Sequence, residues 1–120
     1  MTLAELQGRV REFSEARAWG QFHNPRNLAM AVSVEAGELL ELFLWSADDG
    51  PQPPTPERKQ RVEEEIADVL LCLLNLCERT GVDPTTALLE KLRAAELKYP
   101  VDRVRGSALK YDEYPEWGKP

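Results

Sequence analysis

At three places along the chain, a residue that commonly caps helices is followed directly by proline, and this pattern constrains the fold most strongly. A capping side chain accepts a hydrogen bond from the first turn, and proline fits the first helical position because its missing N–H would have no partner there. A fourth start is Thr2-Leu-Ala-Glu5, which has the form of a capping box. The sequence therefore predicts four helices. The three cap–proline pairs are Asn24-Pro25, Thr55-Pro56 and Asp83-Pro84.

Apolar residues recur at helical spacing after each of these starts, and no strand-like alternation competes with them. Gly81 is expected to end the third helix in the left-handed conformation, and Pro100 to stop the fourth. These signals predict an all-α fold, a four-helix bundle in one domain over residues 1–114 with a C-terminal tail over 115–120. Residues 101–120 show no clear period and are either an ordered extension or a flexible tail. The predicted helices run from Thr2 to about Arg17, from Asn24 to about Trp45, from Thr55 to about Thr80 and from Asp83 to the residue before Pro100.

The composition excludes several classes of function. The chain has 120 residues and a formal net charge of −6, so it lacks the positive charge that grips a nucleic acid backbone or an anionic membrane. No apolar run approaches the roughly 18 residues of a membrane-spanning helix, and no secretory signal is visible. Cys72 and Cys77 point in different directions on one predicted helix and are unsuited to a mutual disulfide. These features predict a cytoplasmic protein.

Two pairs of carboxylates with three-residue spacing lie on the second and third predicted helices. Residues i and i+3 share a helix face, so each pair can aim two carboxylates at one point. Four carboxylates in one place repel one another unless a hard divalent cation lies among them, and Mg²⁺ or Mn²⁺ prefers such oxygen ligands. Because the chain has 21 acidic residues, an ordinary solvated helix surface is the alternative. The pairs are Glu35-Ala-Gly-Glu38 and Glu65-Ile-Ala-Asp68.

Large aromatic residues gather in the segment between the first two predicted helices, Trp19-Gly-Gln-Phe-His23. Trp19 and Phe22 either plug one end of the helix bundle or form a stacking surface for a planar ligand. Helical phase places Trp45 on nearly the same face as Glu38. A carboxylate pair and a tryptophan on one face could serve a metal-bound phosphate and a base together.

These residues resemble the MazG-type all-α nucleoside triphosphate pyrophosphohydrolases, and among them the dCTP pyrophosphatase branch. The resemblance spans roughly Leu3 to Tyr114. It is carried by the two acidic pairs, by Trp19-Gly-Gln-Phe-His-Asn-Pro-Arg-Asn27, Val34-Glu-Ala-Gly-Glu-Leu39 and Phe43-Leu-Trp45, and by Tyr99-Pro100, Arg105-Gly-Ser107 and Lys110-Tyr111.

The resemblance implies a house-cleaning enzyme that converts a nucleoside triphosphate, dCTP or a modified dCTP, to the monophosphate and pyrophosphate. It implies Mg²⁺ as cofactor, with Mn²⁺ as a possible substitute, and a homodimer or homotetramer. It makes Glu35, Glu38, Glu65 and Asp68 the metal ligands, with Glu38 and Asp68 also catalytic. It assigns substrate contacts to Trp19, Gly20, Gln21, Phe22, His23, Trp45 and Lys91.

The chain departs from the pattern of the dCTP branch at three positions. Cys72 stands in place of a tyrosine, Val10 in place of a histidine and Ala95 in place of an asparagine. Each change removes a polar group that could touch the nucleotide, and lost hydrogen bonds to a base can change selectivity by orders of magnitude. An enzyme acting on dUTP or another non-standard nucleotide is therefore one alternative. A non-catalytic, nucleotide-binding helical module is the other.

Overall fold

The computed structural model describes residues 1–44, 53–109 and 111–113, and all its regular elements are helical. The all-α prediction is confirmed within these residues, whereas Trp45 and the end of the predicted tail lie outside them. In chain order the elements are α1 (Leu3–Ala16), the 3-10 turn η1 (Trp19–Phe22), α2 (Pro25–Glu41), α3 (Pro56–Thr80), α4 (Pro84–Lys98), the short α5 (Val101–Val104) and the 3-10 turn η2 (Tyr111–Glu113).

The helices begin where the capping signals predict. Thr2 Oγ1 accepts a hydrogen bond from the Glu5 amide (3.1 Å), and a Glu5 carboxylate oxygen accepts one from the Thr2 amide (2.6 Å). Asn24 Oδ1 accepts a hydrogen bond from the Asn27 amide at 2.8 Å. Both caps satisfy amides that the first helical turn leaves free. The three prolines of the pattern are the first residues of their helices, Pro25, Pro56 and Pro84. Thr55 is the N-cap residue of α3, but its side chain makes no capping hydrogen bond.

Helix α2 ends earlier than predicted, at Glu41. The chain tightens after it, and the Phe43 amide donates to the Leu40 carbonyl at 2.9 Å. The Arg58 guanidinium of α3 donates to the Leu42 carbonyl and lies over the Phe43 ring. The apolar pattern continues beyond the helix because the turn also carries large apolar residues, so periodicity alone does not mark the end.

Helix α3 ends as predicted, with Gly81 in the left-handed region at φ 71°. The Val82 amide donates to the Cys77 carbonyl at 3.0 Å, as in a Schellman-type end. Helix α4 ends before Pro100, as predicted, but the short α5 that follows was not predicted. A single helical turn is too short to produce a recognisable apolar period.

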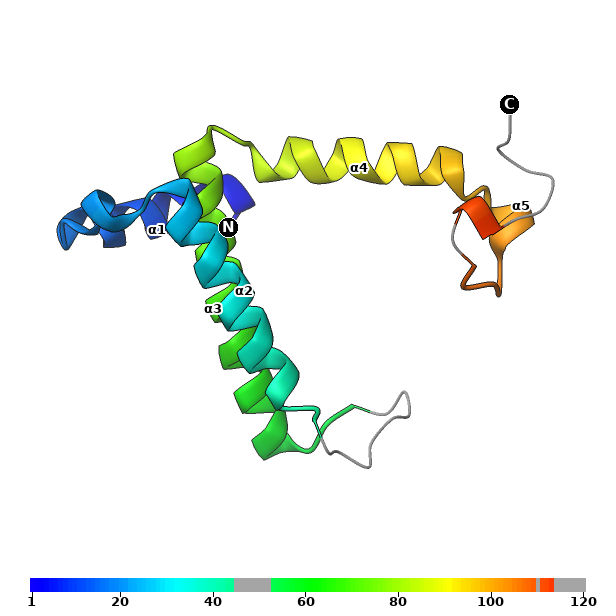
Figure 1. Ribbon diagram of the computed structural model, residues 1–120, viewed down its shortest axis with the longest axis horizontal. Coiled ribbons are helices and arrows are strands. Elements are labelled where there is room, and N and C mark those ends of the chain that lie inside the picture. Colours follow the sequence, from blue (N-terminus) through cyan, green and yellow to red (C-terminus); the bar gives the residue numbers. More distant parts are fainter. Residues whose placement is uncertain (45–52, 110, 114–120) are drawn as a thin grey trace. The chain divides into compact units, whose positions relative to one another are not determined.

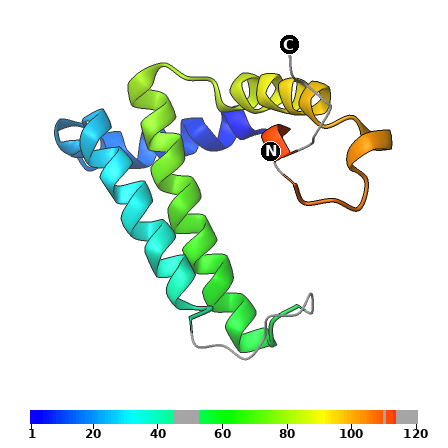
Figure 2. The same ribbon diagram turned by 45° about the vertical axis from the view of Figure 1, so that its right-hand side comes forward.

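The chain divides into two compact units, Met1–Asp83 and Pro84–Pro120. In the first unit α2 and α3 lie side by side (Figures 1 and 2). Helix α1 packs on the C-terminal part of α3, where Arg11 pairs with Glu78 at 3.4 Å. The described hydrophobic residues that are buried are Leu28 and Leu74, both in this unit. The described part of the second unit consists of α4, α5 and η2.

None of the described helices combines the length and the apolar character that crossing a membrane would require.

Candidate functional site

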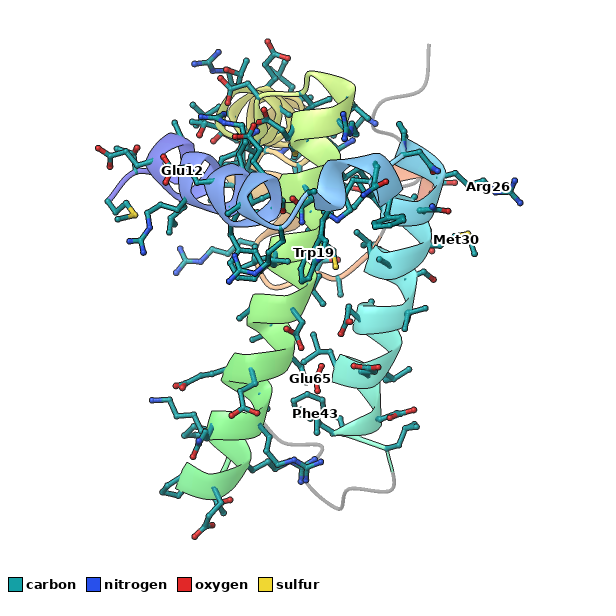
Figure 3. All side chains as sticks on the ribbon, turned by 90° about the vertical axis from the view of Figure 1, so that its left-hand side faces the viewer. Glu12, Trp19, Arg26, Met30, Phe43 and Glu65 are labelled. Carbon is teal, nitrogen blue, oxygen red and sulfur yellow. The ribbon has the colours of Figure 1, made fainter. Side chains whose placement is uncertain are left out.

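The structure brings the four predicted carboxylates together between α2 and α3. Glu35 and Glu38 belong to α2, and Glu65 and Asp68 belong to α3. One oxygen from each side chain lies within 4.8 Å of the corresponding oxygen of every other. In Figure 3 the labelled Glu65 side chain lies in the space between the two helices. The arrangement follows from the i, i+3 spacing on two helices that pack lengthwise.

Two of these carboxylates are in an unfavourable environment. Glu35 Oε2 and Glu65 Oε2 are shielded from solvent, and no described group donates a hydrogen bond to either atom. The pKa of Glu35 is raised above its usual value of 4.5, first because a proton there forms a hydrogen bond with Glu38 and then because of burial. The pKa of Glu65 is raised mainly by burial and then by the charges of Glu38 and Asp68.

This donor set fits a hard divalent cation. Such cations take carboxylate oxygens as ligands, and a cation offsets the mutual repulsion that raises both pKa values. The two shielded oxygens without donors are available as ligand atoms. Each of the four clustered residues offers only carboxylate oxygens to a metal ion, and neither nitrogen nor sulfur.

A cavity of about 190 Å³ is enclosed by α1, η1, α2 and α3. Three aromatic residues line it, Phe13, Trp19 and Phe22. The Trp19 and Phe13 rings meet edge to face, with their centroids 5.6 Å apart. An apolar cavity with aromatic walls and few polar groups is typical of a site for a small planar ligand. Its polar lining includes Ser14, His23, Cys72 and Asn75.

Cys72 connects this cavity with the carboxylate cluster. It lines the cavity and lies one helical turn after Asp68 on α3. Burial raises the pKa of the Cys72 thiol, and the charges of Glu35 and Asp68 raise it further. The cavity is therefore within the electrostatic reach of the carboxylates. Cys72 and Cys77 are both free thiols, as predicted.

Arg79 of α3 holds the aromatic turn η1 through hydrogen bonds. It was not among the site residues predicted from the sequence. Arg79 Nε donates to the His23 carbonyl at 2.7 Å, and Nη2 donates to the Gly20 carbonyl. A Cβ atom added at Gly20 would lie 3.0 Å from Arg79 Nη2, the far end of a flexible side chain. In the sequence Arg79 is recognisable only as a basic residue in the last turn of α3. Basic residues are common at helix ends, so this does not indicate a role in the site.

The structure places the predicted substrate contacts in different environments. Trp19, Phe22 and His23 line the cavity. Gly20 instead lines a neighbouring cavity of about 160 Å³, and the Gln21 side chain donates to the Ala18 carbonyl at 3.0 Å. Lys91 belongs to α4 in the second unit. Trp45 lies outside the described residues. Ser14 and Asn75, which were not predicted from the sequence, also line the cavity with the aromatic walls.

The chain is similar to known proteins in sequence and in structure. Residues 30–113 match the MazG-like family. The chain is 42% identical over 116 residues to dCTP pyrophosphatase 1 of Rattus norvegicus, covering 95% of this chain and 68% of the relative. It is 41% identical over 116 residues to dCTP pyrophosphatase 1 of Homo sapiens, with the same two coverages.

A solved structure of a pyrophosphatase from Archaeoglobus fulgidus is also similar. The two chains are 41% identical and superpose with a TM-score of 0.69, over 82% of this chain and 92% of the other. The matched family region includes all four clustered carboxylates, since it begins before Glu35 and ends after Asp68. The chain therefore belongs to the MazG-like family, and the relatives named above are pyrophosphatases.

Proposed function

We propose that the protein is a divalent-metal-dependent nucleoside triphosphate pyrophosphohydrolase that cleans the cytoplasmic nucleotide pool. The reaction consumes one water and converts a nucleoside triphosphate to the monophosphate and pyrophosphate. The observation that carries the proposal is the convergence of four carboxylates within 4.8 Å, next to a cavity with aromatic walls. The carboxylate cluster can hold a metal ion, and the aromatic cavity can hold a nucleotide base.

The proposed metal ligands are Glu35, Glu38, Glu65 and Asp68, with Mg²⁺ as the cation and Mn²⁺ as a substitute. A bound divalent cation would neutralise triphosphate charge and lower the pKa of a bound water. Glu38 is exposed at the edge of the cluster, so its carboxylate can accept a proton through a water and act as general base. Asp68 is likewise exposed.

The proposed substrate is dCTP or a modified dCTP, as the names of the relatives suggest. Trp19 and Phe22 supply the surfaces on which a base could stack. Trp45 is proposed as a further base contact and Lys91 as a phosphate contact, both from sequence. Cys72, where the dCTP branch has a tyrosine, lines the cavity and removes a polar group that could touch the base. The second candidate substrate is therefore dUTP or another non-standard nucleotide.

Pyrophosphate release from a panel of nucleoside triphosphates, measured with Mg²⁺ and with EDTA, tests the proposal. We expect release from dCTP with Mg²⁺ and none with EDTA. Glu38→Gln should lower the rate by about a hundredfold or more, which is within the range of a catalytic proton transfer. Glu63→Gln is the matched control, because this exposed α3 glutamate pairs with Lys59 and lies outside the cluster. No release from any nucleotide with Mg²⁺ would leave only a nucleotide-binding module.

Self-association as a dimer or tetramer is also proposed. Among the described hydrophobic residues only Leu28 and Leu74 are buried, which is a small core for a chain of this size. An apolar cavity of about 220 Å³ lies between α1 and α3. All the residues that line it are aliphatic, among them Leu6, Val10 and Leu70. A second copy of the chain covering this surface would bury apolar area that the described residues leave exposed.

A further inference from the structure

Ser14 and Asn75 form a polar pair in the wall of the aromatic cavity. Ser14, on α1, is 7% exposed and is the buried polar side chain of the described region. Its hydroxyl donates to Asn75 Oδ1 on α3, at 3.4 Å. Both residues line the cavity, together with Trp19 and Cys72. The two residues are 61 positions apart in the sequence, so the pair exists only because α1 packs on α3.

The hydrogen bond from Ser14 fixes which end of the Asn75 amide is available. A side-chain amide offers one acceptor oxygen and one donor NH₂ group. The oxygen is engaged by Ser14, and within the described residues nothing accepts a hydrogen bond from Asn75 Nδ2. The cavity's other amide, Asn27, already donates through Nδ2 to the Phe22 carbonyl at 3.2 Å. Asn75 and Ser14 also line the neighbouring cavity of about 160 Å³, so the Asn75 amide is a donor at the boundary of the two cavities.

We propose that Asn75, positioned by Ser14, donates a hydrogen bond to a ring carbonyl oxygen of the bound base and so determines base specificity. Pyrimidine bases carry such an oxygen and adenine carries none. An adenine base would leave the amide donor without a partner in a mostly apolar cavity, which is unfavourable. The inference rests on the proposed function, because that function places the base in this cavity.

Calorimetric titration of the full chain with dCMP, dUMP and dAMP in the presence of Mg²⁺ tests the inference without requiring hydrolysis. We expect the wild type to bind dCMP and dUMP about tenfold more tightly than dAMP, as one hydrogen bond allows. Asn75→Ala should weaken dCMP binding about five- to tenfold and change dAMP binding by less than about twofold. Asn75→Asp keeps the shape and the bond from Ser14 but replaces the donor by an acceptor, so it should abolish the preference.

Ser14→Ala tests the positioning role. It frees the amide to rotate, so we expect the ratio of dCMP to dAMP affinity to fall while the thermal unfolding midpoint shows that the chain stays folded. Ser33→Ala, at an exposed position on α2, is the matched control and should leave the ratio unchanged. If Asn75→Ala fails to fold, the ratio of dCMP to dAMP affinity in the shape-conserving Asn75→Asp variant tests the inference instead.

Three results would overturn the inference. The wild type could bind dCMP and dAMP equally, it could bind neither, or Asn75→Asp could leave the ratio of dCMP to dAMP affinity unchanged. The proposed function fails separately. A preference that depends on Asn75, found in a protein that releases no pyrophosphate, would refute the hydrolase and leave the base contact standing. Pyrophosphate release with a preference independent of Asn75 would refute the base contact alone.

Discussion

At the scale of single residues, Glu35 and Glu65 are the groups whose chemistry depends most on what the cluster holds. Each has a shielded oxygen to which no described group donates a hydrogen bond. Each also has a pKa raised above 4.5 in the metal-free protein. Both properties reflect carboxylates held close together between two packed helices. A divalent cation would make the ionised state of both residues favourable.

The raised pKa of Glu65 predicts how the stability of the metal-free protein depends on pH. The folded state binds this proton more tightly than the unfolded chain does, so the residue's favourable contribution is lost as pH rises from about 4.5 through the raised pKa. Glu65→Gln is neutral throughout and escapes this loss. In EDTA we expect the variant to gain stability relative to the wild type as pH rises from about 4.5 through the raised pKa of Glu65.

Urea unfolding of both proteins in EDTA, at several pH values in this window, measures the effect. With Mg²⁺ added, the wild type should be more stable than Glu65→Gln near neutral pH, because only the wild type keeps all four carboxylate ligands. Glu63→Gln controls for the loss of one negative charge on α3. A stability difference between Glu65→Gln and the wild type that does not change with pH would contradict the prediction.

The four carboxylates could be predicted from sequence because each pair follows from the helix period, which is a local property. Their convergence required only that two amphipathic helices pack together. Ser14, Asn75 and Arg79 could not be predicted in the same way. Their partners lie 56 to 61 positions away in the chain, and no period or motif encodes such contacts.

At the scale of elements, the position of η1 depends on α3 through Arg79. The guanidinium donates to two carbonyls of the aromatic segment, those of Gly20 and His23. Ala18, just before η1, has a left-handed φ of 53°, which few non-glycine residues adopt. The turn that carries Trp19 and Phe22 is therefore held from outside the cavity, and Arg79 acts as a positioning residue.

Arg79→Met should loosen η1 and weaken nucleotide binding while the carboxylate cluster stays intact. If the proposed function holds, we expect KM for the nucleotide to rise about tenfold with kcat changed by less than about threefold, the pattern of lost binding without lost chemistry. Arg11→Met is the matched control, because Arg11 pairs with Glu78 and makes no contact with the η1 carbonyls. Steady-state kinetics of both variants give the comparison. A fall in kcat with unchanged KM would contradict the positioning role.

The starts of the elements were more predictable than their ends. Caps and prolines mark a helix start with specific residues, and the hydrogen bonds of Thr2 and Asn24 confirm them. The end of α2 has no such mark, because the large apolar residues continue into the turn that follows Glu41. The contact that this turn makes with Arg58 of α3 is tertiary, and the local sequence does not indicate it.

At the scale of the whole molecule, the proposed self-association is argued from the apolar surface that the described residues expose. Leu70 is 51% exposed and lines the apolar cavity between α1 and α3. Surfaces of this kind commonly mark sites of association. Size-exclusion chromatography with light scattering should show a dimer or tetramer for the wild type at micromolar concentration.

Leu70→Glu should shift that distribution toward the monomer, because a charge at the centre of an apolar interface is costly to desolvate. Gln60→Glu, which adds the same charge at an exposed position of α3, should leave the oligomer unchanged. Light scattering that gives a monomer for the wild type, or the same oligomer for Leu70→Glu, would contradict the proposed interface.

The central claim is that the carboxylates of α2 and α3 hold the cation on which hydrolysis depends. Its most direct test is a calorimetric titration of Mn²⁺ into the wild type and Asp68→Asn, with pyrophosphate release from dCTP measured in the same samples. We predict that Asp68→Asn weakens Mn²⁺ binding by about tenfold or more and lowers the rate in parallel, since a charged ligand is lost. Unchanged Mn²⁺ affinity in the variant, or full pyrophosphate release by the wild type in EDTA, would contradict it.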